Sequence, residues 1–313
     1  MSEPRRNWPP TSPVGWVGTG RMGAAMIGRL LEAAVPVTAY NRTAAKLKPL
    51  VAAGVKPASS IPELARLEVV FVTVGSPDDL IAVTCGEGGL LTGEAVPAII
   101  VDSSTVSADA SAKVRQAAVS RDVELLAAPV SGNPGVAREG RLTFAVSGGK
   151  SAFERVLALL DTIGAGATYV GEGESARLVK LCHNLFLGAV IQSLVEVTLL
   201  ADKAGVSRAD FLAYLNKSVM GSTFTGYKTP ALVDLDFHPT FTAALLKKDM
   251  ELGLEAARAS GVPMPVAALV SNIVSELVAA GYADEDFASL IAMQAGPAGV
   301  NLHEEVSRAA QRQ

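Results

Sequence analysis

The chain has 313 residues, more than one average domain needs, so its length predicts two domains or one large α/β domain with an appendage. Apolar residues make up 49% of the sequence and charged residues 19%, which excludes a disordered or collagen-like chain and predicts a globular protein. The net charge is -4 and there is no long basic run, so we expect no nucleic-acid partner.

The N-terminal half alternates short β-branched runs with Ala- and Leu-rich helical runs. Residues 1–13 lack the apolar run of a secretory signal, so we expect a flexible tail there. The alternation that follows is typical of a parallel sheet covered by helices on both faces. The first helices are expected at 22–34 and 44–53, and the strands at 14–17, 35–40, 69–74, 98–102, 123–130, 142–149 and 167–171.

Strand signals stop after Gly173, and residues 175–202 form an uninterrupted helical pattern of about seven turns. Polar side chains interrupt its apolar stretch, so we expect no transmembrane helix and no membrane partner. A helix this long and apolar must be buried against neighbours, and we expect a homodimer or homotetramer. Cys85 and Cys182 form no CxxC pair, which argues against a disulfide framework and fits a cytoplasmic location.

A glycine-rich motif, GTGRMG, follows the first expected strand and opens the first expected helix. Gly18 permits a tight turn, Gly20 lets the backbone approach a pyrophosphate, and Gly23 lets the helix pack close to the strand. The helix N-terminus supplies N–H groups for phosphates. The motif predicts a dinucleotide site made by Gly18, Thr19, Gly20, Arg21, Met22 and Gly23. The alternative is a turn that only joins strand to helix.

The residues after the second expected strand bear on which dinucleotide binds. NAD enzymes usually carry Asp or Glu there for the ribose hydroxyls, whereas this chain has Asn41, Arg42 and Thr43, with Lys46 nearby. Thr43 is expected to cap the helix 44–53, where a 2′-phosphate would meet the guanidinium, the hydroxyl and the ammonium. We therefore expect NADP (NADPH) rather than NAD. The alternative is an arginine that only stacks on the adenine.

A second constellation lies on the long helix, where Lys180 and Asn184 are four residues apart and share one face. An ammonium in an apolar stretch needs a polar partner or a cleft. Burial there would lower the pKa of the lysine and let it exchange a proton near neutral pH, as a hydride-transfer enzyme requires. The alternative is a lysine that extends to solvent at the helix surface.

Six segments in order carry a resemblance to a known family. They are GTGRMG (18–23), VDSSTVS (101–107), APVSGNPGVAREGRLTFAVSGG (128–149), GEGESARLVKLCHN (171–184), LLKKDMELGLEAA (245–257) and GYADEDFASLI (281–291). Through them the chain, from residue 14 to about 302, resembles the β-hydroxyacid dehydrogenase family. That family includes 3-hydroxyisobutyrate dehydrogenase, tartronate semialdehyde reductase and the glyoxylate and succinic semialdehyde reductases.

The resemblance implies a role for individual residues. Lys180 looks like the general acid in reduction and the base in oxidation, and Asn184 like the side chain that orients substrate. Ser131 and Gly132 resemble the loop that holds the substrate carboxylate, and their backbone, with Gly135 nearby, is expected to form an anion nest. The remaining cofactor contacts implied by the resemblance are Val74, Gly75, Thr105 and Lys248.

The chain departs from the family pattern at three positions. Ala127 replaces an aspartate whose carboxylate would brace the substrate loop, and Asn133 replaces a glycine, adding an amide that either contacts substrate or closes the nest. His183 stands where the family often has asparagine, and we interpret it as a histidine pointing into the protein or an interface. His238 and His303 have no partner at metal-ligand spacing, so no metal site is expected.

Together these patterns predict a doubly wound, Rossmann-type α/β domain over residues 14–172 and an all-α domain over residues 173–313. The expected function is an NADPH-dependent oxidoreductase that interconverts a small aldehyde or keto acid, bearing a carboxylate, and its hydroxy acid. One alternative is a reductase of imines or of carbonyls without a carboxylate, favoured by the changes at Ala127 and Asn133. Another is a non-catalytic NADP-binding redox sensor.

Overall fold

The computed structural model describes residues 12–302, so most of the expected tail at 1–13 lies outside the described residues. The chain divides into two compact units, Met1–Lys180 and Leu181–Gln313, called here the α/β unit and the helical unit. The division falls inside the long helix α8 (Ser175–Lys203), later than the expected boundary at 172/173. The first turn of α8 is hydrogen-bonded to the sheet, since the Ala176 N–H donates to Ser147 Oγ at 3.0 Å.

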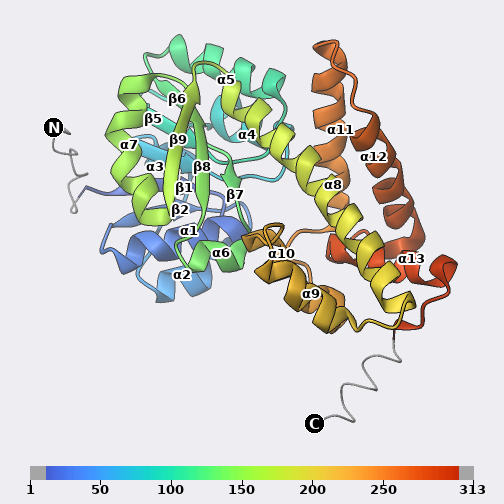
Figure 1. The fold of residues 1–313 in the computed structure, drawn as a ribbon. Coiled ribbons are helices and arrows are strands. Elements are labelled where there is room, and N and C mark those ends of the chain that lie inside the picture. Colours follow the sequence, from blue (N-terminus) through green and yellow to red (C-terminus); the bar gives the residue numbers. More distant parts are fainter. Residues whose placement is uncertain (1–11, 303–313) are drawn as a thin grey trace, which may run out of the picture. The chain divides into compact units, whose positions relative to one another are not determined.

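The described part of the α/β unit is built on a nine-stranded sheet (Figure 1). Six parallel strands lie in the order β3-β2-β1-β4-β5-β6, and β8 then pairs antiparallel with β6. The strands are β1 (Val14–Val17), β2 (Val37–Tyr40), β3 (Lys56–Pro57), β4 (Val69–Val72), β5 (Ile99–Asp102), β6 (Glu124–Ala127), β7 (Val130–Ser131), β8 (Thr143–Ser147) and β9 (Gly166–Gly171). This is the doubly wound arrangement that the sequence predicted.

Two differences from the expected strands have local causes. Strand β2 begins at Val37 rather than at residue 35, directly after Pro36, which has no N–H to give to a ladder. The expected strand 123–130 is divided into β6 and β7 on either side of Pro129, for the same reason. Both short strands pair antiparallel with β8, and β6 also pairs parallel with β5.

Both faces of the central strands are buried, which explains their continuous apolar runs. Alternate residues of β4 enter different cores: Val69 and Phe71 pack with one cluster, and Val70 and Val72 with the other. Helices α1 (Arg21–Glu32), α6 (Pro134–Arg138) and α7 (Lys150–Ile163) supply or contact the first cluster. Helices α3 (Ile61–Leu64), α4 (Pro77–Cys85) and α5 (Ala108–Val119) supply the second.

The helix expected at 44–53 is not continuous. A 3-10 turn at Ala44–Leu47 precedes a short helix, α2 (Lys48–Ala52), whose second residue is Pro49. Proline is favoured in the first turn of a helix because its missing N–H is not needed there, so Pro49 starts a new helix rather than extending the old one. Thr43 precedes the turn, but its side chain makes no capping hydrogen bond, so that part of the prediction was wrong.

The helical unit contains the rest of α8 and a set of shorter helices, as the sequence predicted (Figure 1). They are α9 (Arg208–Lys217), α10 (Thr223–Val233), α11 (Ala243–Ala259), α12 (Pro265–Leu277) and α13 (Leu290–Ala298), with a π-helical turn at Val278–Tyr282 and a 3-10 turn at Phe287–Ser289. One isolated antiparallel bridge joins Thr242 to Asp286.

Two helical stretches, Ser175–Lys203 and Pro265–Tyr282, are long and apolar enough by length and composition alone to cross a membrane. Each supplies side chains to the buried core of the helical unit. Ile191 and Val195 of α8 are fully buried there, and Val274 of α12 is as well. Packing within the structure covers half of the apolar window of Ser175–Lys203 and 28% of that of Pro265–Tyr282.

Candidate active site

The three glycines of the GTGRMG motif occupy positions with different steric demands. Gly18 has a φ of +93°, and a Cβ there would lie 2.1 Å from the carbonyl oxygen of Thr73. A Cβ on Gly23 would lie 2.2 Å from the carbonyl oxygen of Gly18, since α1 packs closely on the end of β1. Around Gly20, by contrast, no described atom comes within 4 Å of that position. The turn, the close packing and the open approach are the geometry a pyrophosphate-binding loop needs.

This cradle lies where the strand order reverses. Strand β1 has β2 and β3 on one side and β4, β5 and β6 on the other, so the carboxyl ends of β1 and β4 meet at the switch point. Two hydroxyls there, Thr19 Oγ1 and Thr73 Oγ1, are buried without a hydrogen-bond partner among the described residues. Buried hydroxyls normally have partners, so the edge fits a polar ligand such as a dinucleotide. Arg21 and Met22 begin α1 beside it.

Asn41 braces the cradle from the end of β2. Its Oδ1 accepts a hydrogen bond from the backbone N–H of Thr19 at 2.9 Å, and its Nδ2 donates to the carbonyl oxygen of Thr43 at 3.0 Å. Both ends of the amide are therefore used to hold two loops together. The sequence predicted a cofactor contact at Asn41, and the structure gives it a loop-bracing position next to the expected phosphate site.

The basic residues after β2 are accessible. Arg42, Thr43 and Lys46 are all exposed, and the Arg42 side chain is 87% exposed. Its Nη1 lies 3.1 Å from Oδ1 of Asp79, in the first turn of α4. The sequence analysis found no acid near Arg42, because Asp79 is 37 residues further along the chain. An exposed ion pair of this kind contributes about 0–1 kcal/mol, so a phosphate dianion can replace it.

The other expected cofactor residues follow the neighbouring strands. Val74 comes after β4, and its backbone N–H donates to Ser104 Oγ at 2.9 Å. Gly75 is exposed next to it, and Thr105 is half-buried after β5. These residues therefore lie at the carboxyl ends of adjacent parallel strands, the same edge that carries Gly18.

The substrate-loop residues Ser131, Gly132 and Asn133 lie at and after β7. Gly132 has a φ of +127°, and a Cβ there would come within 2.6 Å of Leu142 Cδ2, so only glycine fits. Asn133 caps α6, since its Oδ1 accepts from the Val136 N–H at 3.0 Å. Gly135 lies inside α6 instead of extending a nest, so the flexible backbone expected from the glycine spacing is shorter than predicted.

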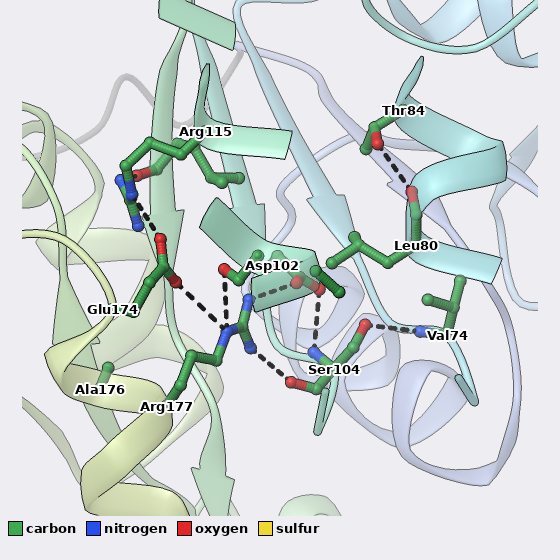
Figure 2. A network of polar contacts seen from close by, with 12 residues as sticks. Val74, Leu80, Thr84, Asp102, Ser104, Arg115, Glu174, Ala176 and Arg177 are labelled. Carbon is green, nitrogen blue, oxygen red and sulfur yellow. Dashed lines mark hydrogen bonds and ion pairs between the residues drawn. The ribbon is translucent and has the colours of Figure 1, made fainter. Parts of the chain in front are cut away.

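The first turns of α8 carry a network of buried polar contacts that the sequence analysis missed (Figure 2). The guanidinium of Arg177, 1% exposed, pairs with the carboxylate of Asp102, which is fully buried at the end of β5. Lys180 follows one helical turn later and is half-buried. The sequence held one signal for Arg177: a cation in an apolar helix, as unusual there as Lys180 itself.

In the helical unit, Asn184 is held by an acid. Its Nδ2 donates to Oδ2 of Asp249 at 2.6 Å, both residues are 1% exposed, and Nδ1 of the half-buried His183 lies 2.9 Å from its Oδ1. Lys248 Nζ lies 3.3 Å from Asp249 Oδ1. Asp249 was not among the predicted site residues, although it falls on the buried face of α11 with Leu246 and Met250.

A second buried ion pair lies deeper in the helical unit. Lys228 Nζ is 2.5 Å from Asp286 Oδ1 and 4.0 Å from the centre of the Phe287 ring. Burial lowers the pKa of Lys228, and the charge of Asp286 offsets this only in part. Burial raises the pKa of Asp286, but the Lys228 charge and hydrogen bonds from Lys228, Ala288 and Thr240 together hold that pKa below its usual value.

Asp286 also caps the 3-10 turn at Phe287–Ser289, where its side chain accepts from the Ala288 N–H. Its ion pair with Lys228 joins segments 58 residues apart, which no local pattern predicts. Across residues 12–302, no group of three or more His, Cys, Asp or Glu side chains is placed to hold a metal ion. His303 lies outside this range.

A glycine cradle at the switch point of a doubly wound sheet, followed by a helical unit, defines a dinucleotide-binding protein. Residues 13–171 match a family model described as the NAD-binding domain of 6-phosphogluconate dehydrogenase. Residues 174–294 match one described as the NAD-binding of NADP-dependent 3-hydroxyisobutyrate dehydrogenase. The chain belongs to the β-hydroxyacid dehydrogenase family, as its motifs predicted, and it is an oxidoreductase acting on CH–OH donors.

Individual relatives support this assignment. Glyoxylate/succinic semialdehyde reductase 2 of Arabidopsis thaliana is 30% identical over 90% of this chain and 79% of its own length. The crystal structure of 3-hydroxyisobutyrate dehydrogenase from Salmonella typhimurium has a TM-score of 0.81 at 25% identity, covering 90% of this chain and 99% of that one. A structure titled Psf3 in complex with NADP+ and 2-OPP has the same fold, with a TM-score of 0.82 at 24% identity over 90% of this chain and 99% of that chain.

Proposed function

We propose that this oxidoreductase uses NADPH to reduce a small aldehyde or keto acid bearing a carboxylate, and that it catalyses the reverse oxidation with NADP. The observation that carries the proposal is the glycine cradle in the same unit as Lys180, an amine on the long apolar helix. The relatives named above, a semialdehyde reductase and a hydroxyacid dehydrogenase, favour a short carboxylate-bearing substrate.

The choice of NADP rests on the end of β2. Arg42 is exposed there, Thr43 and Lys46 are exposed next to it, and no acidic residue occupies the three positions after the strand. A guanidinium and an ammonium attract a 2′-phosphate, whereas the acid usual in NAD enzymes would repel it. Asn41, with both ends of its amide bonded, would hold this loop against the GTGRMG turn.

The chemistry divides between the coenzyme and the chain. When bound, NADPH supplies the hydride that reduces the substrate carbonyl. Lys180 donates a proton from Nζ to the carbonyl oxygen in reduction and accepts it back in oxidation. Ser131 and Gly132, in the same unit as Lys180, hold the substrate carboxylate through a hydroxyl and a backbone N–H. The amide of Asn184, the side chain expected to orient the substrate, is fixed by Asp249.

The substrate class is tested by following NADPH oxidation with glyoxylate, succinic semialdehyde, tartronate semialdehyde, methylmalonate semialdehyde and cyclic imines, each repeated with NADH. We expect one carboxylate-bearing aldehyde or keto acid to dominate and kcat/KM to be higher with NADPH. Dominant turnover of a cyclic imine would assign the chain to the imine-reducing alternative instead. A higher kcat/KM with NADH would contradict the role given to Arg42.

Lys180→Ala tests the proton donor. Loss of a positioned general acid should lower kcat by about 10² to 10⁴, with little change in the dissociation constant for NADPH. Stopped-flow reduction and coenzyme fluorescence measure the two quantities, and Lys217→Ala, at an exposed lysine of α9, is the matched control. A folded Lys180→Ala protein that keeps kcat within tenfold of the parent would refute the role.

We also propose that the protein is a homodimer or homotetramer formed partly through α8. Val179, Phe186 and Leu200 lie on one face of this helix at multiples of seven residues and are exposed, Phe186 by 71% and Leu200 by 70%. Large apolar side chains gathered on one face are typical of a surface covered by a partner. Sedimentation equilibrium should give two or four chain masses at micromolar concentration, and Phe186→Asp should lower the mass. A monomer mass for the parent would end this proposal.

A further inference from the structure

We propose that Arg177 is a positioning residue for Lys180. Its buried ion pair with Asp102 fastens the first turns of α8 to the end of β5, and so keeps Lys180 with the unit that carries the dinucleotide cradle (Figure 2). This inference rests on the proposed role of Lys180 in proton transfer.

All three nitrogens of the Arg177 guanidinium donate a hydrogen bond in this attachment. Its Nη2 donates to the carboxylate of Asp102, its Nη1 donates to the carbonyl oxygen of Ser104 at 2.5 Å, and its Nε donates to Ser111 Oγ at 3.2 Å. The acceptors come from the end of β5, the loop after it and helix α5. A planar group bound at three points fixes a helix turn both in position and in rotation.

The attachment continues across the edge of the sheet. Asp102 Oδ1 accepts from the Ser104 N–H at 3.0 Å, and Ser104 Oγ accepts from the Val74 N–H at 2.9 Å. A short chain of contacts therefore runs from Arg177 through β5 to the end of β4. Since β4 pairs with β1, which leads into Gly18, the turn of α8 before Lys180 is linked to the expected cofactor edge.

Two further side chains, Arg115 and Ser147, hold the beginning of α8. Arg115 of α5 pairs with Glu174 at 2.7 Å and donates to the carbonyl oxygen of Gly173 at 2.8 Å. Ser147 Oγ, at the end of β8, accepts from the Ala176 N–H and donates to the same Gly173 oxygen. The residues just before Lys180 are thus tied to the sheet and to α5, which is why the compact α/β unit extends to Lys180.

Stability alone does not account for a buried ion pair at this place. Desolvating two charges costs several kcal/mol, and well-packed apolar residues of similar volume are often as stable or more so. What the pair adds is a fixed orientation of the first turns of α8. In a helix, residues three apart are neighbours and the Cα–Cβ bonds tilt toward the N-terminus, so the Cβ of Lys180 is directed toward the turn that Arg177 holds. A misplacement of about 1 Å at a reacting group can cost about 10² in rate.

The decisive variant is the double substitution Arg177→Met with Asp102→Asn. It leaves no unpaired buried charge, and the asparagine oxygen can still accept from the Ser104 N–H, so the chain is expected to fold. Arg177→Lys is the conservative variant, since one ammonium keeps the charge but cannot reach three acceptors in different directions. Arg155→Met is the control, because Arg155 forms an exposed ion pair with Glu68.

We expect the double variant to lose about 10- to 100-fold in kcat with an NADPH dissociation constant within twofold of the parent. The kcat of Arg177→Lys should lie between those of the double variant and the parent, and the kcat of Arg155→Met should match that of the parent. A second readout does not need activity: after reductive ¹³C-methylation, the Lys180 methyl resonance, assigned with Lys180→Arg, should move toward those of exposed lysines in the double variant and stay in place in Arg155→Met.

Unchanged methyl resonances together with kcat within twofold of the parent would overturn the positioning role. A fall in kcat accompanied by an equal weakening of NADPH binding would overturn it as well, because it would indicate general damage to the unit. If the parent reduces none of the substrates, the proposed function fails, and the resonance of Lys180 then decides the positioning role alone.

Discussion

In the part of the chain that the structure describes, each unit contains an ion pair whose two side chains are at most 2% exposed, and these two pairs differ in what they hold. Arg177–Asp102 joins the start of α8 to the end of a central strand, one helical turn before Lys180. Lys228–Asp286 joins α10 to the segment before a 3-10 turn and is surrounded by Thr240 and the ring of Phe287. Both acids are 1% exposed or less, so burial does not separate them.

The difference lies in the acceptors around each pair. The guanidinium of Arg177 donates to three groups, one each in β5, the loop after it and α5. The carboxylate of Asp286 instead gathers donors from its own surroundings: Lys228, the N–H and hydroxyl of Thr240, and the N–H of Ala288. Around Arg177 the hydrogen bonds start from one planar cation, which orients the helix that carries it. Around Asp286 several donors bind one carboxylate, which holds the neighbouring loops together.

The largest expected effect concerns the pair in the helical unit. Asp286→Asn leaves the buried ammonium of Lys228 without a counter-charge, so the free energy of unfolding should fall by about 3–5 kcal/mol. Urea denaturation followed by circular dichroism measures it. Asp284→Asn, at an exposed acid two residues away, should change the same quantity by less than about 0.5 kcal/mol.

The same substitution also tests which of the two ion pairs serves catalysis. If Asp286→Asn lowered kcat by more than tenfold while the unfolding free energy stayed within about 0.5 kcal/mol of the parent, the helical pair would be the functional one. The two pairs would then no longer differ in function, because the substitutions at Arg177 and Asp102 are expected to lower kcat while the protein still folds.

The smallest effect concerns a third pair, Arg42–Asp79, which is exposed where the other two are buried. Asp79→Asn removes an acid that competes for Arg42 and repels a 2′-phosphate. Since an exposed pair contributes about 0–1 kcal/mol, the dissociation constant for NADPH should fall by at most about fivefold, while that for NADH stays the same. Coenzyme fluorescence titration measures both constants.

Asp78→Asn is the matched control, because Asp78 is exposed in the same first turn of α4 and is not the acid paired with Arg42. Equal tightening of NADPH and NADH by Asp79→Asn would show that the acid acts on the shared part of the coenzymes. Arg42 would then not be the residue that distinguishes them.

The fold was largely predictable because its signals are local. The apolar runs at β1, β4 and β5 gave strands within two residues of the expected ends, and the helix expected at 175–202 is α8. Three of the errors follow from proline: Pro36 and Pro129 shorten or divide strands, and Pro49 restarts a helix. Each is a local effect of proline on the backbone, and the spacing of apolar residues along the sequence does not reveal it.

The part of the candidate site that was predictable is the glycine motif, because its residues are chosen by the steric room at each position. Gly18, Gly20 and Gly23 could be assigned separate roles before their geometry was known, because each role depends on the absence of one Cβ. The acids that hold the site were not found. Asp249 beside Asn184 and Asp79 beside Arg42 lie 65 and 37 residues from their partners.

The amino-acid sequence by itself determined the doubly wound sheet, the glycine cradle and the helix that presents Lys180, since period, turn chemistry and steric room are properties of neighbouring residues. Only the tertiary structure decided that Arg177 binds Asp102 and that Lys228 binds Asp286. Where a charged group is buried depends on which distant segment folds against it, and a buried charge persists only with its partner in place.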